Sequence, residues 1–479
     1  MLKSIAVAKG DGIGSEIMDV VIDVFQQLEV PLEYKYIDMG KDIFLQGHKL
    51  GMTPQAQKTV EELGILFKGP METPKGGGNR SINVTARKMW STFANCRTFK
   101  TLPGVETIYS KMGIPINLTI IRENLEDTYG GVEHLITADL AIARRFISAP
   151  GSYKVHKYAF EYAKQQGLKS VVCAHKANIM KITDGMFLEV FYELAKEYPE
   201  IKASDVIIDD LCMKLVTIPN QYELIVLPNL QGDIVSDLCA GLVGGLGFAP
   251  SANIGNNIKI FEAVHGTAPD KVGQNIANPT ALLMSGLMML NFLGFTTHAK
   301  KIEMALIQTL QAKIHTADLK VSNSPVSTTE YGKAIVAKAK AISKMEVEKQ
   351  IGNAKAINLS TTANSKDSTM LTMNKTKDKC IGIDVFIESI ENANTIVSKL
   401  EKLDLQGFKL DVISNRGTNV YPNFSKYSEC INSYTLRFLA TEIKETKGLE
   451  FASMLANHYK ILSVEFLREY EGKLGFSVI

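Results

Sequence analysis

The sequence lacks several features that would each indicate a particular class of protein. Its six cysteines include no CxxC spacing, which excludes a disulfide scaffold or a zinc finger; we interpret them as buried thiols in a reducing compartment. The formal net charge is only +2, so no overall positive field favours nucleic acid or an anionic membrane. The longest apolar run, residues 280–295, is too short to span a bilayer comfortably and contains Ser285 and Asn291. We predict a buried helix there.

The beginning of the chain has no secretory signal pattern. The residues MLKSIAVAKGDG lead directly into a predicted strand and a glycine-rich loop. We therefore expect a cytoplasmic protein that binds neither nucleic acid nor a membrane. A length of 479 residues predicts two to three folding units, and 45% hydrophobic with 22% charged residues is typical of a globular protein with a large core.

Short apolar runs alternate with helical patterns through most of the chain. The predicted strands are residues 4–8, 170–174, 206–210 and 224–228, and the predicted helices are residues 15–28 and 155–167. This alternation predicts an α/β fold with a largely parallel sheet.

The composition changes after about residue 340. Residues 352–377 are rich in Ser, Thr, Asn and Lys and have no periodicity, which predicts a linker. The patterns beyond it follow the order strand, helix, strand, strand, helix, strand, which is typical of a small ferredoxin-like module. Such modules have many unrelated functions. Packing that extends a dimer is our preferred interpretation here, and a regulatory ligand-binding domain is the alternative.

The segment KGDGIGSE, residues 9–16, suggests a dinucleotide-binding fingerprint because it follows a predicted strand and begins a helix, with Asp38 ending the next predicted strand. The fingerprint requires glycine where this chain has Ser15, and Glu16 would meet a pyrophosphate at the helix N-terminus. We therefore interpret the segment as a tight strand-to-helix turn.

Two aspartates in NLQGDIVSD stand four residues apart. On a helix, Asp233 and Asp237 would lie on one face and repel each other unless a cation lies between them. Mg²⁺ or Mn²⁺ would suit these oxygen ligands, and Asp209, at the end of the predicted strand 206–210, could add a third. Two solvated acids on a helix face are the alternative.

Arginines gather near glycine-rich turns. Arg80 and Arg87 lie within KGGGNRSINVTARK, together with the polar residues Ser81 and Asn83, and Arg97 and Arg122 follow, the latter with Tyr129 nearby. Several guanidinium groups suit a substrate with several carboxylates, because the two groups pair in bidentate geometry. Surface ion pairing is the alternative. Lys176, directly after the predicted strand 170–174, is either a catalytic lysine or merely exposed.

Five segments in this order resemble the isocitrate/isopropylmalate dehydrogenase family of metal-dependent β-decarboxylating dehydrogenases: GGGNRSINVTARK, RENLEDTYGG, HKANIMKITDG, NLQGDIVSD and HGTAP…ANP. The resemblance covers about residues 1–340 and is, more narrowly, to the isocitrate dehydrogenases. The linker and C-terminal module resemble the extension of some dimeric bacterial members. The implied fold is the two-domain α/β fold of that family, which is not a classical Rossmann fold, with a small α+β ferredoxin-like C-terminal module. Its implied parts are a large domain of residues 1–92 and 244–350, a small domain of 93–126 and 171–243, a clasp of 127–170 that intertwines two subunits, a linker of 351–378 and a module of 379–479.

The resemblance also implies an activity and residue roles. The reaction would be the oxidative decarboxylation of isocitrate to 2-oxoglutarate and CO₂, a step of the tricarboxylic acid cycle, with hydride transfer to NAD(P) in a homodimer with shared active sites. The implied metal ligands are Asp233, Asp237 and the partner subunit's Asp209. The implied catalytic residues are Tyr129, as proton donor, and the partner subunit's Lys176 and Asp209. The implied substrate ligands are Ser81, Asn83, Arg87, Arg97 and Arg122.

The choice of substrate depends on Ser81 and Asn83, which imply hydrogen bonds to the γ-carboxylate of isocitrate. Against the isopropyl group of 3-isopropylmalate, each of these polar groups would be buried without a partner at a cost of about 1–3 kcal/mol. A 3-isopropylmalate dehydrogenase-like enzyme is therefore the less favoured alternative. A non-catalytic regulatory subunit is another, although such a chain is expected to have lost Tyr129 or Lys176, and this one has both.

The segment HGTAPDKVGQ, residues 265–274, bears on the coenzyme. The implied coenzyme-binding residues are Thr73, His265, Gly266, Thr267, Ala268, Asp270, Lys271 and Asn278. NADP-dependent members typically have Lys-Tyr where this chain has Asp270 and Lys271, and we align Ala317 and Val321 with their downstream Tyr and Arg. At about 5 Å and an effective dielectric of 20, the carboxylate would repel each unit of charge on a 2′-phosphate by about 3 kcal/mol. The sequence therefore predicts NAD rather than NADP, with Lys271 the one residue that favours NADP.

Overall fold

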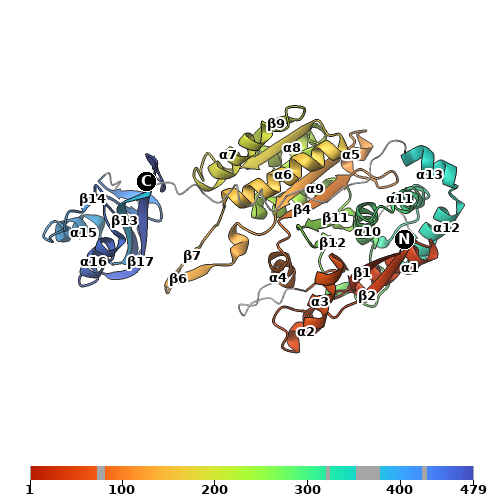
Figure 1. The fold of residues 1–479 in the computed structure, drawn as a ribbon, viewed down its shortest axis with the longest axis horizontal. Coiled ribbons are helices and arrows are strands. Elements are labelled where there is room, and N and C mark those ends of the chain that lie inside the picture. The colour runs from red at the N-terminus through yellow and green to blue at the C-terminus, as the bar shows by residue number, and fades with distance from the viewer. Residues whose placement is uncertain (1, 73–80, 320–323, 352–377, 423–428, 478–479) are drawn as a thin grey trace. The chain divides into compact units, whose positions relative to one another are not determined.

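The computed structural model describes residues 2–72, 81–319, 324–351, 378–422 and 429–477. The chain forms two compact units, Met1–Gly131 with Arg145–Asp367, and Val132–Arg144 with Ser368–Ile479. Figure 1 traces both.

The first unit alternates strands and helices, as predicted (Figure 1). Its strands are β1 (Lys3–Ala8), β2 (Leu32–Tyr36), β3 (Ile65–Lys68), β4 (Ala94–Lys100), β5 (Asn117–Glu123), β8 (Ser170–His175), β9 (Lys202–Ile207), β10 (Leu224–Leu227), β11 (Pro250–Ile254) and β12 (Lys259–Ala263). Its α-helices are α1 (Gly14–Gln27), α2 (Lys41–Leu45), α3 (Pro54–Leu63), α4 (Ile82–Met89), α5 (Ile108–Lys111), α6 (Ala149–Gln166), α7 (Thr183–Ala195), α8 (Ile208–Thr217), α9 (Asn229–Leu242), α10 (Thr280–Phe292), α11 (Thr296–Gln311), α12 (Thr328–Ala341) and α13 (Lys344–Ile351). Its 3₁₀ turns are η1 (Thr128–Gly130), η2 (Pro219–Gln221), η3 (Leu246–Phe248), η4 (Pro269–Lys271) and η5 (Ala317–Leu319).

These ten strands form one sheet in the order β2-β1-β3-β12-β11-β4-β5-β10-β8-β9. The three central pairs, β12–β11, β11–β4 and β4–β5, are antiparallel, and the outer pairs are parallel. The sheet runs continuously through the predicted large and small domains. The division of the chain into large domain, small domain and clasp stays a prediction.

Helices cover both faces of this sheet, because its strands bury alternate residues on opposite sides. In β1, Ile5 and Val7 belong to the core beneath α1 and α10, whereas Ala6 and Ala8 belong to the core beneath α3 and α4. Along β10 the same alternation directs its residues to the core beneath α6 or to the core beneath α8 and α9. This doubly covered sheet confirms the α/β prediction.

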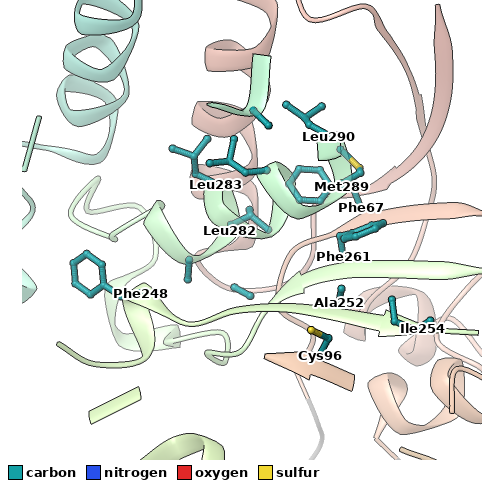
Figure 2. Packing of buried hydrophobic residues seen from close by; sticks show 14 of the residues in the cluster. Phe67, Cys96, Phe248, Ala252, Ile254, Phe261, Leu282, Leu283, Met289 and Leu290 are labelled. Carbon is teal, nitrogen blue, oxygen red and sulfur yellow. The ribbon is translucent and has the colours of Figure 1, made fainter. Parts of the chain in front are cut away.

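Helix α10 is the buried helix predicted at residues 280–295. Figure 2 shows Leu282, Leu283 and Met289 of this helix gathered with Phe67 of β3 and Phe261 of β12, all in one core. Among the described residues, no helix is both long and apolar enough to cross a membrane.

The second unit contains an antiparallel hairpin of β6 (Glu133–Thr137) and β7 (Leu140–Ala143), together with the C-terminal module. The module comprises β13 (Asp378–Glu388), α15 (Ala393–Leu400), β14 (Lys409–Asn415), β15 (Thr418–Tyr421), β16 (Ser433–Leu439), α16 (Glu445–Leu455), β17 (Lys460–Tyr470) and β18 (Lys473–Leu474). Its sheet has the order β15-β14-β16-β13-β17-β18. The predicted order of strands and helices is confirmed; β15 and β18 were not predicted.

Two expectations need correction. The predicted strand 206–210 ends at Ile207, and α8 begins at Ile208. The apolar residues of α8 recur at helical spacing, and its two acids, Asp209 and Asp210, favour the first turn of a helix. Of the six cysteines, which are all free, Cys96, Cys173, Cys239 and Cys380 are buried as expected, whereas Cys212 is half-buried and Cys430 is exposed.

Candidate active site

The candidate site centres on Asp233, in the second turn of α9. Its carboxylate receives a hydrogen bond from the hydroxyl of Tyr129 at 2.6 Å and forms an ion pair with Arg122. The Arg122 guanidinium lies 4.8 Å from the centroid of the Tyr129 ring and donates to Asn229 Oδ1 at 2.7 and 3.0 Å. The end of β5, the turn η1 and helix α9 therefore meet here through three predicted site residues.

Asp237 lies one turn further along α9, on the same face as Asp233. Arg97 of β4 lies 3.5 Å from a carboxylate oxygen of Asp233 and 4.0 Å from one of Asp237. The arginine is buried and donates to Asn95 Oδ1 at 2.6 Å, which fixes its orientation. The two acids that were predicted to share a cation thus face two arginines.

Burial and charge move the pKa values of these groups in different directions. Burial raises the pKa of Asp233, but Arg122 and Arg97 outweigh it, so the pKa lies below its usual value. Burial raises the pKa of Asp237, and its neighbour Asp233 adds to the effect. Burial also raises the pKa of Tyr129, which keeps its phenol protonated and able to donate.

Helix α4 carries the remaining predicted substrate ligands. Ser81 stands at its N-terminal boundary, and Asn83 and Arg87 lie one turn apart. The Arg87 guanidinium lies 3.0 Å from Glu262 of β12, and Asn83 Oδ1 accepts a hydrogen bond from Lys68 at 2.8 Å. Arg80 lies outside the described residues.

Lys176 and Asp209 form an ion pair with each other. Lys176 directly follows β8, as predicted, whereas Asp209 lies in the first turn of α8 and not at a strand end. Among the described residues, no three acidic, cysteine or histidine side chains are grouped to hold a metal ion, so Asp209 does not join Asp233 and Asp237 within one chain.

The segment 265–278 packs against the turn at residues 9–16. Ile13 donates its N–H to Thr267 O at 2.9 Å, and a Cβ on Gly12 would stand 2.1 Å from that same oxygen. Gly12 has φ +59°, and Glu16 accepts a hydrogen bond from the N–H of Gly273. The glycines of KGDGIGSE therefore serve a close approach between two loops, which supports their interpretation as a tight turn.

His265 has the properties expected of an adenine-binding group. Its Nδ1 lies 3.0 Å from Gly266 O, and its Nε2 is buried with no hydrogen-bond partner among the described residues. Burial lowers the pKa of the imidazole and so favours its neutral form. An orphaned buried nitrogen of this kind fits a ligand such as the adenosine half of a nicotinamide coenzyme.

The charged residues of this segment are open to solvent. Asp270 and Lys271 are both exposed in η4, Gly266 is exposed, and Ala268 is half-buried. Asn278 donates to Asp318 Oδ2 at 2.9 Å and accepts from Thr280 N at 3.0 Å. Thr73 and Val321 lie outside the described residues, whereas Ala317 begins η5.

Residue patterns did not identify the buried charges behind the site. Lys68 and Glu262 form an ion pair with side chains 1% and 5% exposed, and Asn253 donates to Glu262 at 2.7 Å. One signal was present for Lys68, which is the lone charged residue of the otherwise apolar strand β3, whereas Glu262 shares the buried strand β12 with Lys259.

Comparison of the sequence with known protein families identifies the family of this chain. Residues 4–335 match the isocitrate/isopropylmalate dehydrogenase family. The chain belongs to this family. Residues 378–479 match the C-terminal domain of bacterial isocitrate dehydrogenase. Both parts of the resemblance inferred from the motifs are therefore confirmed.

The relatives include full-length and partial matches. An isocitrate dehydrogenase [NADP] of Thermus thermophilus is 39% identical over 99% of this chain and 95% of its own. A catalytic subunit of a mitochondrial isocitrate dehydrogenase [NAD] of Arabidopsis thaliana is 46% identical over 68% of this chain and 86% of its own. The crystal structure of the TT0538 protein from Thermus thermophilus has a TM-score of 0.92 at 38% identity and covers 99% of this chain and 95% of its own.

These relatives support a nicotinamide coenzyme, but they do not support the predicted preference for NAD. Those that match 99% of this chain, from Thermus and several Rickettsia species, are named as NADP enzymes. One feature of η4 weakens the predicted repulsion. Asp270 is exposed to solvent, and the exposed Lys271 beside it carries the opposite charge.

Proposed function

We propose that this protein catalyses the metal-dependent oxidative decarboxylation of isocitrate with a nicotinamide coenzyme. The observation that carries the proposal is the convergence of Arg97, Arg122 and Tyr129 on Asp233 and Asp237. Two guanidinium groups supply the positive charge that a tricarboxylate needs, and the two acids supply oxygen ligands for a hard cation. The names of the relatives agree with this interpretation.

The donor set fits Mg²⁺ or Mn²⁺. Asp233 and Asp237 present carboxylates on one helix face, with side chains 39% and 59% exposed, so a cation can reach them from solvent. The partner's Asp209 would be the third ligand. A cation bound here supplies Lewis-acid stabilisation of the negative charge that develops on the substrate oxygen.

The residues of the chain divide the proton transfers between them. A bound nicotinamide coenzyme would supply the acceptor for the C2 hydride. The C2 hydroxyl proton would be removed with the help of the partner's Lys176 and the partner's Asp209 together. The bond to the departing carboxylate then breaks, CO₂ leaves, and the electron pair stays on the substrate carbon. Tyr129 donates its hydroxyl proton to that carbon. The carboxylates of the substrate are oriented by the side chains of Ser81, Asn83, Arg87, Arg97 and Arg122.

A homodimer with shared sites is part of the proposal. Lys176 and Asp209 pair with each other, and no third acid joins Asp233 and Asp237 among the described residues of one chain, which supports a site completed by a second subunit. Exposed apolar side chains support a buried interface at the adjoining helices α8 and α9. They are Met213 (53%), Val216 (51%), Leu230 (39%) and Ile234 (61%).

Subunit mixing tests this arrangement. The inactive variants Tyr129→Phe and Lys176→Met, refolded or co-expressed together, should form hybrid dimers in which one site has both native residues. Random pairing makes about half of the dimers hybrid and restores about a quarter of the wild-type activity. No recovery from hybrids of confirmed composition would exclude a site shared in this way.

Substrate and metal are tested by direct assay. We expect turnover of isocitrate with Mg²⁺ or Mn²⁺, none with 3-isopropylmalate, and loss of activity after dialysis against EDTA that is reversed by either cation. A chain that binds isocitrate but does not turn it over would instead indicate a regulatory subunit.

For the coenzyme we propose NADP, which the names of the full-length relatives support. The exposed Lys271 in η4 could pair with the 2′-phosphate of NADP. The test is kcat/KM with NADP and NAD side by side, for the wild type and for Lys271→Ala. A wild-type preference for NAD would contradict the proposal and make Asp270 the controlling residue.

A further inference from the structure

A buried three-residue ion network lies behind the site. Arg145, between β7 and α6, donates from Nε to Asp127 Oδ1 at 2.5 Å and from a terminal nitrogen to Asp184 Oδ1. The side chains of Asp127 and Asp184 are fully buried, and that of Arg145 is 17% exposed. Two buried carboxylates require a shared counter-charge, and Arg145 provides it.

Asp127 connects the turn of Tyr129 with the helix of Asp233. Its carboxylate accepts from the N–H of Thr128 at 2.8 Å and from the N–H of Leu230, in the first turn of α9, at 2.9 Å. Its backbone has φ +64°, a conformation that costs free energy in a residue other than glycine and persists only where contacts impose it. The position of Tyr129 therefore depends on how Asp127 is held.

Asp184 holds the backbone of Lys176 in the same way. Its Oδ2 accepts from the backbone N–H of Lys176 at 2.6 Å and from Gln231 Nε2 at 3.3 Å. Asp184 thus fixes the backbone from which the lysine side chain extends. Arg145 is the link between this acid and Asp127.

We propose that Arg145 is a positioning residue that holds the Tyr129 turn and the Lys176 backbone in one fixed arrangement. This inference rests on the proposed function. There, Tyr129 and Lys176 of one chain act in different active sites of the dimer, so Arg145 of a single chain sets the geometry of both sites.

The first test is kinetic. Arg145→Met should lower kcat about a hundredfold, because small displacements of catalytic groups cost that much, while KM for isocitrate stays within about threefold. Arg145→Lys keeps the positive charge but lacks the two-pronged guanidinium group that reaches both carboxylates, so it should recover part of the lost kcat. The control is Arg144→Met, since the side chain of this neighbour pairs at 2.9 Å with Glu465 instead. Activity of folded Arg145→Met above half of wild type would overturn the proposal.

The decisive test uses hybrid dimers with a different affinity tag on each chain. A hybrid of wild-type and Tyr129→Phe chains should retain about half of the wild-type activity, because one site keeps its tyrosine. A hybrid of wild-type and Arg145→Met chains should fall below about a tenth, because both sites receive a displaced residue. Retention of half of the activity in the second hybrid would overturn the proposal.

The two hybrids separate failure of this inference from failure of the proposed function. If the Tyr129→Phe hybrid does not lose half of the activity, the assignment of Tyr129 to one of two shared sites is wrong. If that hybrid behaves as expected and the Arg145→Met hybrid matches it, only the role of Arg145 is wrong. If Arg145→Met does not fold, the same comparison is made with a hybrid of wild-type and Arg145→Lys chains. This hybrid should have less than half of the wild-type activity, and retention of half would overturn the proposal.

Discussion

Replacing Glu262 with glutamine should destabilise the first unit strongly. Glu262 is 5% exposed and is the counter-ion of Lys68, which is 1% exposed, and of Arg87 at 3.0 Å. Burial raises the pKa of Glu262, but Lys68 and Arg87 more than reverse this and hold it well below the usual range. The substitution therefore removes a carboxylate that is charged near neutral pH.

The expected magnitude follows from what remains. Removal of one partner from a buried ion pair typically costs about 3–5 kcal/mol, because the other charge stays buried without compensation. Lys68→Met should cost less, since Glu262 keeps Arg87 as counter-ion and Asn253 as hydrogen-bond donor. The double variant should cost clearly less than the sum of the two, because neither charge then remains.

Tryptophan fluorescence is a suitable assay. Trp90, the single tryptophan of the sequence, is 7% exposed in the core cluster that contains Leu66 and Ile260, neighbours of the ion pair in β3 and β12. Urea unfolding followed at this residue reports the first unit without the C-terminal module. The protein concentration is kept constant because an oligomer unfolds in a concentration-dependent way.

The control is Glu303→Gln. Glu303 also has two lysine partners, at 2.8 and 3.7 Å, but its side chain is 31% exposed, so its loss should cost at most about 1 kcal/mol. The reasoning is refuted if Glu262→Gln costs no more than this control, or if the effects of Glu262→Gln and Lys68→Met are additive.

Three further predictions concern other positions. Burial raises the pKa of Glu123 from 4.5 to about 7, so the folded protein holds this proton more tightly than the unfolded chain; its contribution to stability is full below about pH 4.5 and is lost as the pH rises through 7. Glu123→Gln should remove this loss of stability, which amounts to up to about 3 kcal/mol. The thermal midpoints of the wild type and the variant at pH 5 and pH 8 measure the effect. If the two proteins lose the same stability between these pH values, the prediction is wrong. Gly12→Ala places a Cβ 2.1 Å from the backbone oxygen of Thr267, an implied coenzyme-binding residue, at φ +59°. It should therefore lower the thermal midpoint and raise KM for the coenzyme more than KM for isocitrate, and an unchanged coenzyme KM would contradict the role of Thr267 in coenzyme binding. Ser81→Asp should nearly abolish activity by placing a carboxylate beside that of isocitrate, and full kcat/KM in this variant would show that Ser81 does not face the substrate.

Local patterns were sufficient for the elements that they predicted, but not for every boundary. The run at residues 224–228 forms β10 because a short, wholly apolar segment fits a strand buried on both faces. The run at 206–210 is divided between β9 and α8, because its apolar residues suit either structure and its two acids favour a helical first turn. Periodicity alone does not separate these outcomes.

The candidate site shows a sharper division. Motif resemblance identified Arg122, Tyr129 and Asp233, which the structure brings into contact across more than a hundred residues of sequence. It did not identify Lys68 with Glu262, because β3 and β12 become neighbours only when the sheet forms. A lone charge in an apolar strand indicates that a partner exists, but only the strand order indicates which one.

The coenzyme prediction shows how strongly a charge argument depends on solvent exposure. At about 5 Å, a unit charge repels another by about 3 kcal/mol at a dielectric of 20 but by only about 0.8 kcal/mol in bulk water. Asp270 is exposed, so its effect lies toward the smaller value, and the exposed Lys271 beside it opposes it. A 2′-phosphate carries a charge of about −1.5 to −2, so even the smaller value amounts to about 1.2–1.7 kcal/mol, close to the ~1.4 kcal/mol of a tenfold preference. We therefore expect the preference to depend on the balance of Asp270 and Lys271, with the exposure of each deciding its weight.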